Sequence, residues 1–195
     1  MAAFILLTSC NNSNPQSLTV NQINDSVISL TNQYQDTSKF LQAISIINSA
    51  IRLDSNHYES YCKKVFFETA LGDFNGASKT LTHLIKLKPD SADLYLQRGL
   101  FKELNYDSLT SKPDFAKAVL LYKLTLDSMD NKNPYWLAYW KNSAACLILE
   151  GQGQIIHEFL KENCKTSVDS SIYDINILSR NRDELLQTFR SKYIR

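Results

Sequence analysis

The chain of 195 residues repeats itself at an interval of about 34 residues. This interval, the repeat shift, places Phe40 on Phe74 and Ala43 on Ala77. It also superimposes three more apolar pairs, which are Ile51 on Ile85, Leu53 on Leu87, and Tyr61 on Tyr95. A further copy carries Phe115, whose interval from Phe74 is longer because this copy has seven extra residues. A period of this length indicates stacked supersecondary units rather than one closed core.

Residues 71 to 90 show what one unit is. Gly72 can adopt the left-handed conformation that ends a helix, and Asp73 can cap the free amides of the next helix. Phe74, Ala77, Leu81, Leu84 and Ile85 then share one helical face. Pro89 ends the run, because proline disfavours helix in the residue before it. The unit is therefore a helix, a turn, a second helix and a stop.

The third unit differs by its seven extra residues. We expect these residues to lie in the turn segment 105–113, which is rich in Asn, Asp, Ser and Pro. Ala43, Ala77 and Ala118 are expected to face the core, where small side chains allow helices to approach closely. A generic helical bundle with coincidental periodicity is the alternative.

These residues resemble the tetratricopeptide repeat family, whose units of about 34 residues are paired antiparallel helices. The second repeat, 58–91, fits best, with Leu71-Gly72-Asp73-Phe74 and Pro89. The first repeat spans 24–57, the third about 92–132, and a degenerate fourth about 134–163. The resemblance implies an all-α fold, a right-handed α-solenoid of three to four helix-turn-helix repeats spanning 24–163, with a C-terminal capping helix.

The N-terminus differs in kind from the repeats. Residues 1–10 contain a short apolar run followed by Leu7-Thr8-Ser9-Cys10, and polar residues come next. This pattern resembles the end of a bacterial lipoprotein signal peptide, in which Cys10 is the acylated residue. Residues 11–23 would then be a polar tether. No Lys or Arg precedes the apolar run, so a frayed N-terminus with an ordinary cysteine stays open as the alternative.

The C-terminal segment, 164–195, is expected to be a loop followed by a capping helix. Asn181 and Glu184 form a capping-box pattern. An apolar stripe follows, which consists of Leu185, Leu186, Phe189 and Tyr193. We expect this helix to cover the open apolar face of the last repeat. The aromatic cluster Tyr135-Trp136-Tyr139-Trp140 is expected to pack in the core, with an exposed contact surface as the alternative.

Composition and motifs argue against several functions. Lys and Arg total 21 against 20 Asp and Glu, which gives no basic bias towards nucleic acid. Cys62, Cys146 and Cys164 match no zinc spacing, and no catalytic or phosphate-binding motif occurs. We therefore expect no metal site, no cofactor and no enzymatic activity. Whether a pair of cysteines forms a disulfide is left open.

The family resemblance implies that first helices line a groove that binds a protein or peptide segment. The residues at those positions are Ile28, Asn32, Cys62, Lys63, Phe66, Leu96, Gln97, Leu100 and Lys141, and we expect Asn32, Lys63, Phe66, Leu96, Gln97, Leu100 and Lys141 to contact the partner. We expect a lipid-anchored binding module on the periplasmic face of the outer membrane, acting as a scaffold or adaptor. The alternatives are an immunity lipoprotein that neutralises a secreted toxin, and a cytoplasmic adaptor if Cys10 is not acylated.

Overall fold

The computed structural model describes Thr19, Val20, Gln22, Val27 and residues 37–130, 132–155 and 181–193. Within these residues the chain forms seven α-helices and one short 3-10 helix. Their bounds are α2 Thr37–Leu53, α3 Tyr58–Ala70, α4 Phe74–Leu87, α5 Ala92–Leu104, α6 Ser108–Ser128, α7 Trp136–Glu150, η1 Gly153–Ile155 and α10 Arg182–Tyr193.

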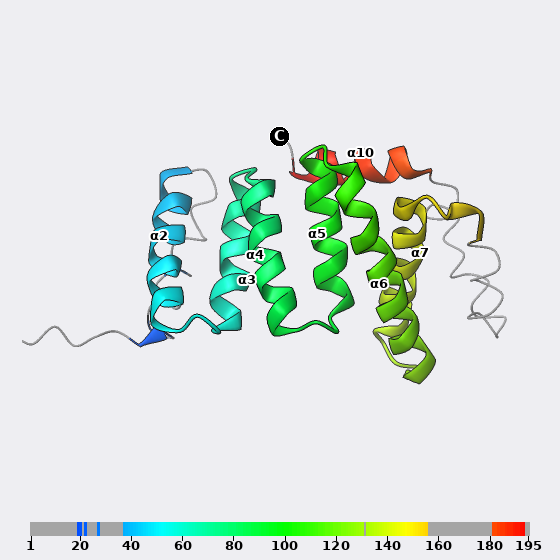
Figure 1. The fold of residues 1–195 in the computed structure, drawn as a ribbon, viewed down its shortest axis with the longest axis horizontal. Coiled ribbons are helices and arrows are strands. Elements are labelled where there is room, and N and C mark those ends of the chain that lie inside the picture. The colour runs from blue at the N-terminus through cyan, green and yellow to red at the C-terminus, as the bar shows by residue number, and fades with distance from the viewer. Residues whose placement is uncertain are drawn as a thin grey trace, which may run out of the picture.

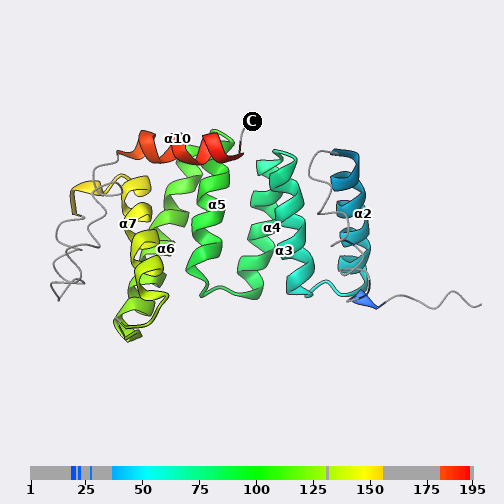
Figure 2. The same ribbon diagram turned by 180° about the vertical axis from the view of Figure 1, so that it is seen from behind.

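The helices from α2 to α7 stand side by side in one extended row (Figures 1 and 2). Each of these helices packs on the helices that precede and follow it in the chain. This sequential packing confirms the predicted all-α array of helix-turn-helix repeats. The pairs α3–α4 and α5–α6 are the second and third repeats, and α2 is the second helix of the first.

In the described residues, the turn that ends the first helix of a repeat occurs three times, after α3, α5 and α7, with the same hydrogen bonds. Gly72, Tyr106 and Gly151 have positive φ angles of 73°, 60° and 100°. In each turn, the next residue donates its backbone N–H to a carbonyl five positions earlier. These bonds are Asp73 to Glu68 (2.8 Å), Asp107 to Lys102 (2.8 Å) and Gln152 to Leu147 (2.8 Å). This is the bond pattern of a helix closed by a left-handed residue.

The third repeat places its seven extra residues in a helix, so the prediction that they lie in the turn was wrong. Asp107 corresponds to Asp73 by the repeat shift and caps α6 as Asp73 caps α4, since each accepts a backbone N–H from three positions ahead. α6 therefore has 21 residues where α4 has 14. Seven residues are about two helical turns, with a drift of only about 20°. Phe115 and Ala118 thus keep the orientation of Phe74 and Ala77.

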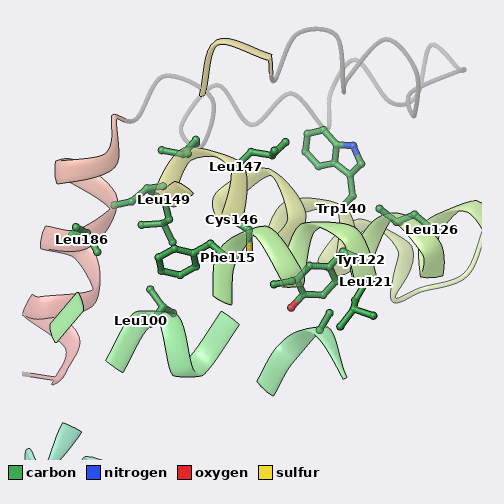
Figure 3. Close-up of a cluster of buried hydrophobic side chains, with 14 of the residues drawn as sticks. Leu100, Phe115, Leu121, Tyr122, Leu126, Trp140, Cys146, Leu147, Leu149 and Leu186 are labelled. Atoms are coloured by element: carbon green, nitrogen blue, oxygen red, sulfur yellow. The ribbon is translucent and has the colours of Figure 1, made fainter. Parts of the chain in front are cut away.

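The core follows the row as three clusters of buried apolar side chains. One joins α2 and α3 around Phe40 and Phe67, and one joins α3, α4 and α5 around Leu81 and Phe101. The largest joins α5, α6, α7 and α10 (Figure 3). Ala43, Ala77 and Ala118 are fully buried, as predicted.

The aromatic cluster at the start of α7 is divided between core and surface. Trp136 and Trp140 are buried in the largest cluster, and Tyr139 packs partly against it. Tyr135 alone is exposed. The expected core packing therefore holds for three of the four rings.

α10 runs along one edge of the row, across the tips of α5 and α7 (Figures 1 and 2). The capping box is confirmed: Asn181 accepts the Glu184 N–H at 3.0 Å, and Glu184 accepts the Asn181 N–H at 3.1 Å. Leu185 and Leu186 are buried. The helix thus packs on the third repeat as well as on the last one, whose open apolar face it was expected to cover.

Candidate partner-binding surface

The predicted groove residues lie on the first helices of the repeats, α3, α5 and α7. On α3, Phe66 is 45% exposed, and its ring packs edge-on against the buried ring of Phe67, with centroids 5.1 Å apart. Lys63, one turn earlier, forms an ion pair with Glu59 at 2.9 Å. The hydrogen bond and charge of Lys63 lower the pKa of Glu59. A half-exposed aromatic ring beside an ion pair is therefore the main accessible feature of α3.

On α5, the three predicted contact residues have different environments. Gln97 is exposed, and Leu96 is half-buried against the largest core cluster. Leu100 is only 8% exposed and lies in that cluster, close to Phe115 and Leu186 (Figure 3). Leu100 therefore has little surface to offer a partner, because the third repeat and α10 enclose it.

Lys141 on α7 is half-buried and lies nearly two turns beyond the exposed Tyr135. Asn32 and Cys10, the predicted amide contact and lipid attachment site, lie outside the described residues. Among the described residues of the predicted surface, Leu100 is buried, and those that keep accessible area are Lys63, Phe66, Leu96, Gln97 and Lys141. Their role as partner contacts stays a prediction.

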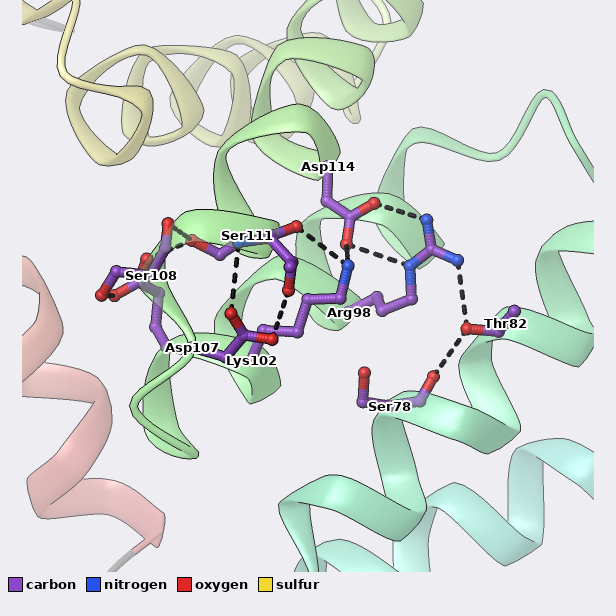
Figure 4. Close-up of polar contacts among 10 residues, drawn as sticks. Ser78, Thr82, Arg98, Lys102, Asp107, Ser108, Ser111 and Asp114 are labelled. Atoms are coloured by element: carbon purple, nitrogen blue, oxygen red, sulfur yellow. Dashed lines mark hydrogen bonds and ion pairs between the residues drawn. The ribbon is translucent and has the colours of Figure 1, made fainter.

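A buried ion network fixes the orientation of α6 on α5, and sequence analysis did not find it. The buried Asp114 carboxylate accepts two bonds from Arg98, at 3.0 and 2.5 Å, and pairs with Lys102 at 2.8 Å (Figure 4). Arg98 also donates to Thr82 on α4 at 3.1 Å. The spacing of Arg98 and Lys102, four residues apart on one helical face, was the available signal.

A second buried carboxylate joins three helices. Glu103 on α5 is 1% exposed and accepts bonds from Ser108 at 2.9 Å, from Ser111, and from Arg182 on α10 at 2.6 Å. Arg182 also donates to the Leu149 carbonyl at the end of α7, at 3.1 Å. The first residue of α10 therefore ties the C-terminal ends of α5 and α7 together.

The described cysteines and histidines have structural environments. Burial raises the pKa of the Cys62 and Cys146 thiols, which disfavours the reactive thiolate. His57 caps α3 by accepting the Ser60 N–H, and His83 stacks on Tyr61 with ring centroids 4.1 Å apart. Among the described residues, no group of three or more His, Cys, Asp or Glu side chains could hold a metal ion.

None of the helices in the described part of the chain combines the length and apolar character needed to cross a membrane. The residues around Cys10 are outside that part.

The similarity to known proteins is one of fold. No protein-family model matches the sequence, and no curated protein matches it. The structure resembles that of "MamA RS-1 ArsTM double mutant", with a TM-score of 0.51 and 14% identity over 75% of this chain and 78% of the other. A second similar structure is "PilW, widely conserved type IV pilus biogenesis factor", with a TM-score of 0.45 and 22% identity over 73% and 61%. The sequential packing of the helices and the similarity to the first of these structures show that the chain has a tetratricopeptide-like fold.

Proposed function

We propose that this chain is a non-enzymatic scaffold or adaptor that binds a protein segment along its first helices. Tetratricopeptide-like arrays expose a long surface built from successive repeats, and that architecture suits extended partners. The segment would be an amphipathic helix or an extended strand that pairs apolar groups with Phe66 and Leu96 and polar groups with Lys63 and Gln97. Lys141 would extend this contact along α7, and Asn32 is a further proposed contact residue.

The exposure of Phe66 is the observation that carries this proposal. This residue is 45% exposed on a helix whose other large apolar side chains are mostly buried. Aromatic side chains of this kind contribute disproportionately to protein interfaces, because they bury a large area at small entropic cost. Lys63 lies one turn away and supplies a charge next to the apolar ring.

Affinity capture from envelope extracts tests this function with the full chain, solubilised in mild detergent. The test variant is Lys63→Glu/Phe66→Gln, and the matched control is Leu41→Gln on α2, another half-exposed apolar residue. We expect one partner to be retained by the parent and the control and lost by the test variant. A partner retained equally by all three proteins would contradict binding along the first helices.

We further propose that Cys10 carries the acyl groups that anchor the chain at the periplasmic face of the outer membrane. The motif Leu7-Thr8-Ser9-Cys10 and the polar residues after it support this proposal. Two or more acyl chains give stable anchoring. Mass spectrometry of the full chain is expected to show a lipid mass on Cys10 that Cys10→Ser lacks. An unmodified Cys10 in membrane-fractionated cells would instead favour the cytoplasmic adaptor.

The identity of the captured partner separates two roles. A transport or assembly protein of the same envelope supports the scaffold. A secreted toxin whose activity falls when the chain is added supports the alternative, an immunity lipoprotein.

A further inference from the structure

The outer face of α6 carries an apolar stripe that its counterpart in the second repeat lacks. Leu109, Leu120 and Leu124 are 85%, 51% and 58% exposed, and Pro113 is exposed between them. At 100° per residue these four side chains fall within about 60° of one another, opposite the buried face that contains Phe115, Ala118 and Tyr122. The stripe is about 22 Å long, which is four turns of helix.

The second repeat shows that this stripe is not a general property of the outer face. The exposed residues of α4 are all polar: Asn75, Lys79, Thr82 and Lys86. Leu120 occupies the place of Lys79 when Phe115 is aligned with Phe74. Leu109 and Pro113 lie in the seven residues that only α6 has. The outer face is thus apolar in α6 and polar in α4.

Positively charged side chains lie along both edges of the stripe. Lys112, Lys117 and Lys123 flank the leucines on both sides and are exposed. Asp114 is buried in its pairs with Arg98 and Lys102, so it points away from this face (Figure 4). Asp127 is the exposed acidic residue at the far end of the helix. The face therefore combines apolar side chains with a positive rim, which complements a partner with an apolar ridge and carboxylates beside it.

We propose that the α6 stripe is a second docking surface, separate from the first helices, that binds an amphipathic helix with acidic flanks from a partner protein. Leu120 and Leu124 expose only about half of their surface and fit the ridges and grooves of a facing helix. A bilayer interface is the poorer match, because interfacial helices sink their apolar face by about 5–10 Å and commonly carry Trp or Phe there. The stripe has neither residue.

The test measures fluorescence anisotropy of two labelled helical peptides of about 18 residues, five turns, titrated with the full chain. One peptide has a leucine stripe flanked by glutamates, and the other has lysines in place of the glutamates. The parent is expected to bind the acidic peptide at least about tenfold more tightly than the basic one, and added salt should reduce the difference. No binding of the acidic peptide, or equal binding of both, overturns the proposal.

Three variants locate the binding. Leu120→Gln/Leu124→Gln should weaken binding of the acidic peptide at least about tenfold, because it removes the apolar contact. Lys112→Glu/Lys117→Glu should reverse the preference between the peptides. Leu41→Gln/Leu53→Gln removes two comparably exposed leucines from α2 and should leave binding unchanged. Circular dichroism confirms that each variant is folded, and unchanged binding by the first variant overturns the proposal.

A vesicle-binding experiment tests whether the stripe binds a lipid surface instead of a protein. Cosedimentation of the Cys10→Ser chain with vesicles of phosphatidylcholine and phosphatidylglycerol is expected to be absent. Sedimentation that depends on Leu120 and Leu124 would overturn the protein partner in favour of a lipid surface.

Discussion

The second and third repeats share a sequence pattern, yet equivalent positions in them have opposite environments. Phe66 and Leu100 are related by the repeat shift, but Phe66 is 45% exposed and Leu100 is 8% exposed. Thr69 and Glu103 are likewise related; Thr69 bonds within its own helix, and Glu103 joins three helices. The third repeat is the one covered by α7 and α10. A repeat position therefore specifies backbone geometry, and the neighbours determine whether its side chain is surface or core.

The largest difference in stability loss between equivalent positions is expected for substitutions of Phe66 and Leu100. Leu100→Ala should lower the free energy of unfolding by about 2–5 kcal/mol, because it removes buried methyl groups and leaves a cavity. Phe66→Ala should change it by less than about 1 kcal/mol, since the ring is half-exposed. Urea unfolding followed by circular dichroism measures both. Similar losses in the two variants would mean that the repeats are enclosed to the same degree.

Substitutions of Thr69 and Glu103 should differ almost as much in their effect on the free energy of unfolding. Glu103→Ala removes a buried carboxylate and leaves Arg182 without its 2.6 Å partner, which should cost about 2–4 kcal/mol. Thr69→Ala loses one intrahelical bond and should cost less than about 1 kcal/mol.

Limited proteolysis adds a readout that is specific to α10. Glu103→Ala should speed cleavage in the segment before Asn181, and Thr69→Ala should not. Unchanged cleavage in both variants would show that the Arg182 contact does not hold α10 in place.

Substitutions at the turn residues Gly72 and Tyr106 should change the free energy of unfolding by a smaller amount, and with opposite sign in the two repeats. Gly72 has a φ of 73°, and a Cβ added there would meet no atom within 4 Å, so Gly72→Ala adds backbone strain alone. A left-handed conformation costs a non-glycine residue about 1–2 kcal/mol. Tyr106 already bears that cost at φ 60°. Tyr106→Gly should therefore raise the unfolding free energy by up to about 1 kcal/mol, reduced by the loss of its contact with Arg190.

Thermal unfolding of Gly72→Ala and Tyr106→Gly measures the sign of each change in stability. A stabilised Gly72→Ala or a destabilised Tyr106→Gly would show that contacts, and not backbone strain, dominate these turns.

The sequence predicts what local chemistry determines. Gly72, Asp73 and Asn181 carry recognisable turn and capping signals, and the structure places them in those roles. The left-handed turn at Tyr106 was not predicted, because a tyrosine is not a residue that indicates this conformation. The composition of the segment 105–113 favours a loop because Asn, Asp, Ser and Pro are frequent in loops, but seven residues preserve the helical phase and continue the helix.

Local sequence patterns do not predict which of the candidate contact residues are buried. The prediction that Leu100 is a contact residue rests on its repeat position, which faces the groove in the tetratricopeptide repeat family that the sequence resembles. Its burial depends on Phe115 and on Leu186, which lies far along the sequence. Long-range packing of this kind leaves no trace in the spacing of one repeat.

The smallest predicted effect concerns pH and the pair Glu68 and Lys102, which are again related by the repeat shift. Lys102 pairs with Asp114 at 2.8 Å. Glu68 is buried and accepts the Thr80 hydroxyl at 2.7 Å, while Lys64 is 3.9 Å away. Burial raises the pKa of Glu68 above its ordinary value of 4.5, and the Thr80 bond and the Lys64 charge oppose that rise only in part.

A carboxyl whose pKa is raised by folding binds its proton more tightly in the folded chain. Its contribution to stability is therefore complete below pH 4.5 and is lost as pH rises through the folded pKa. Glu68→Gln should remove this loss, so the parent's stability relative to the variant should fall with rising pH and then level off. Thr80→Val removes the donor that favours the charged form and should steepen the fall. A pH-independent difference between parent and Glu68→Gln in urea unfolding would show that Glu68 is as well solvated as a surface carboxylate, and the contrast with Lys102 would then be one of charge alone.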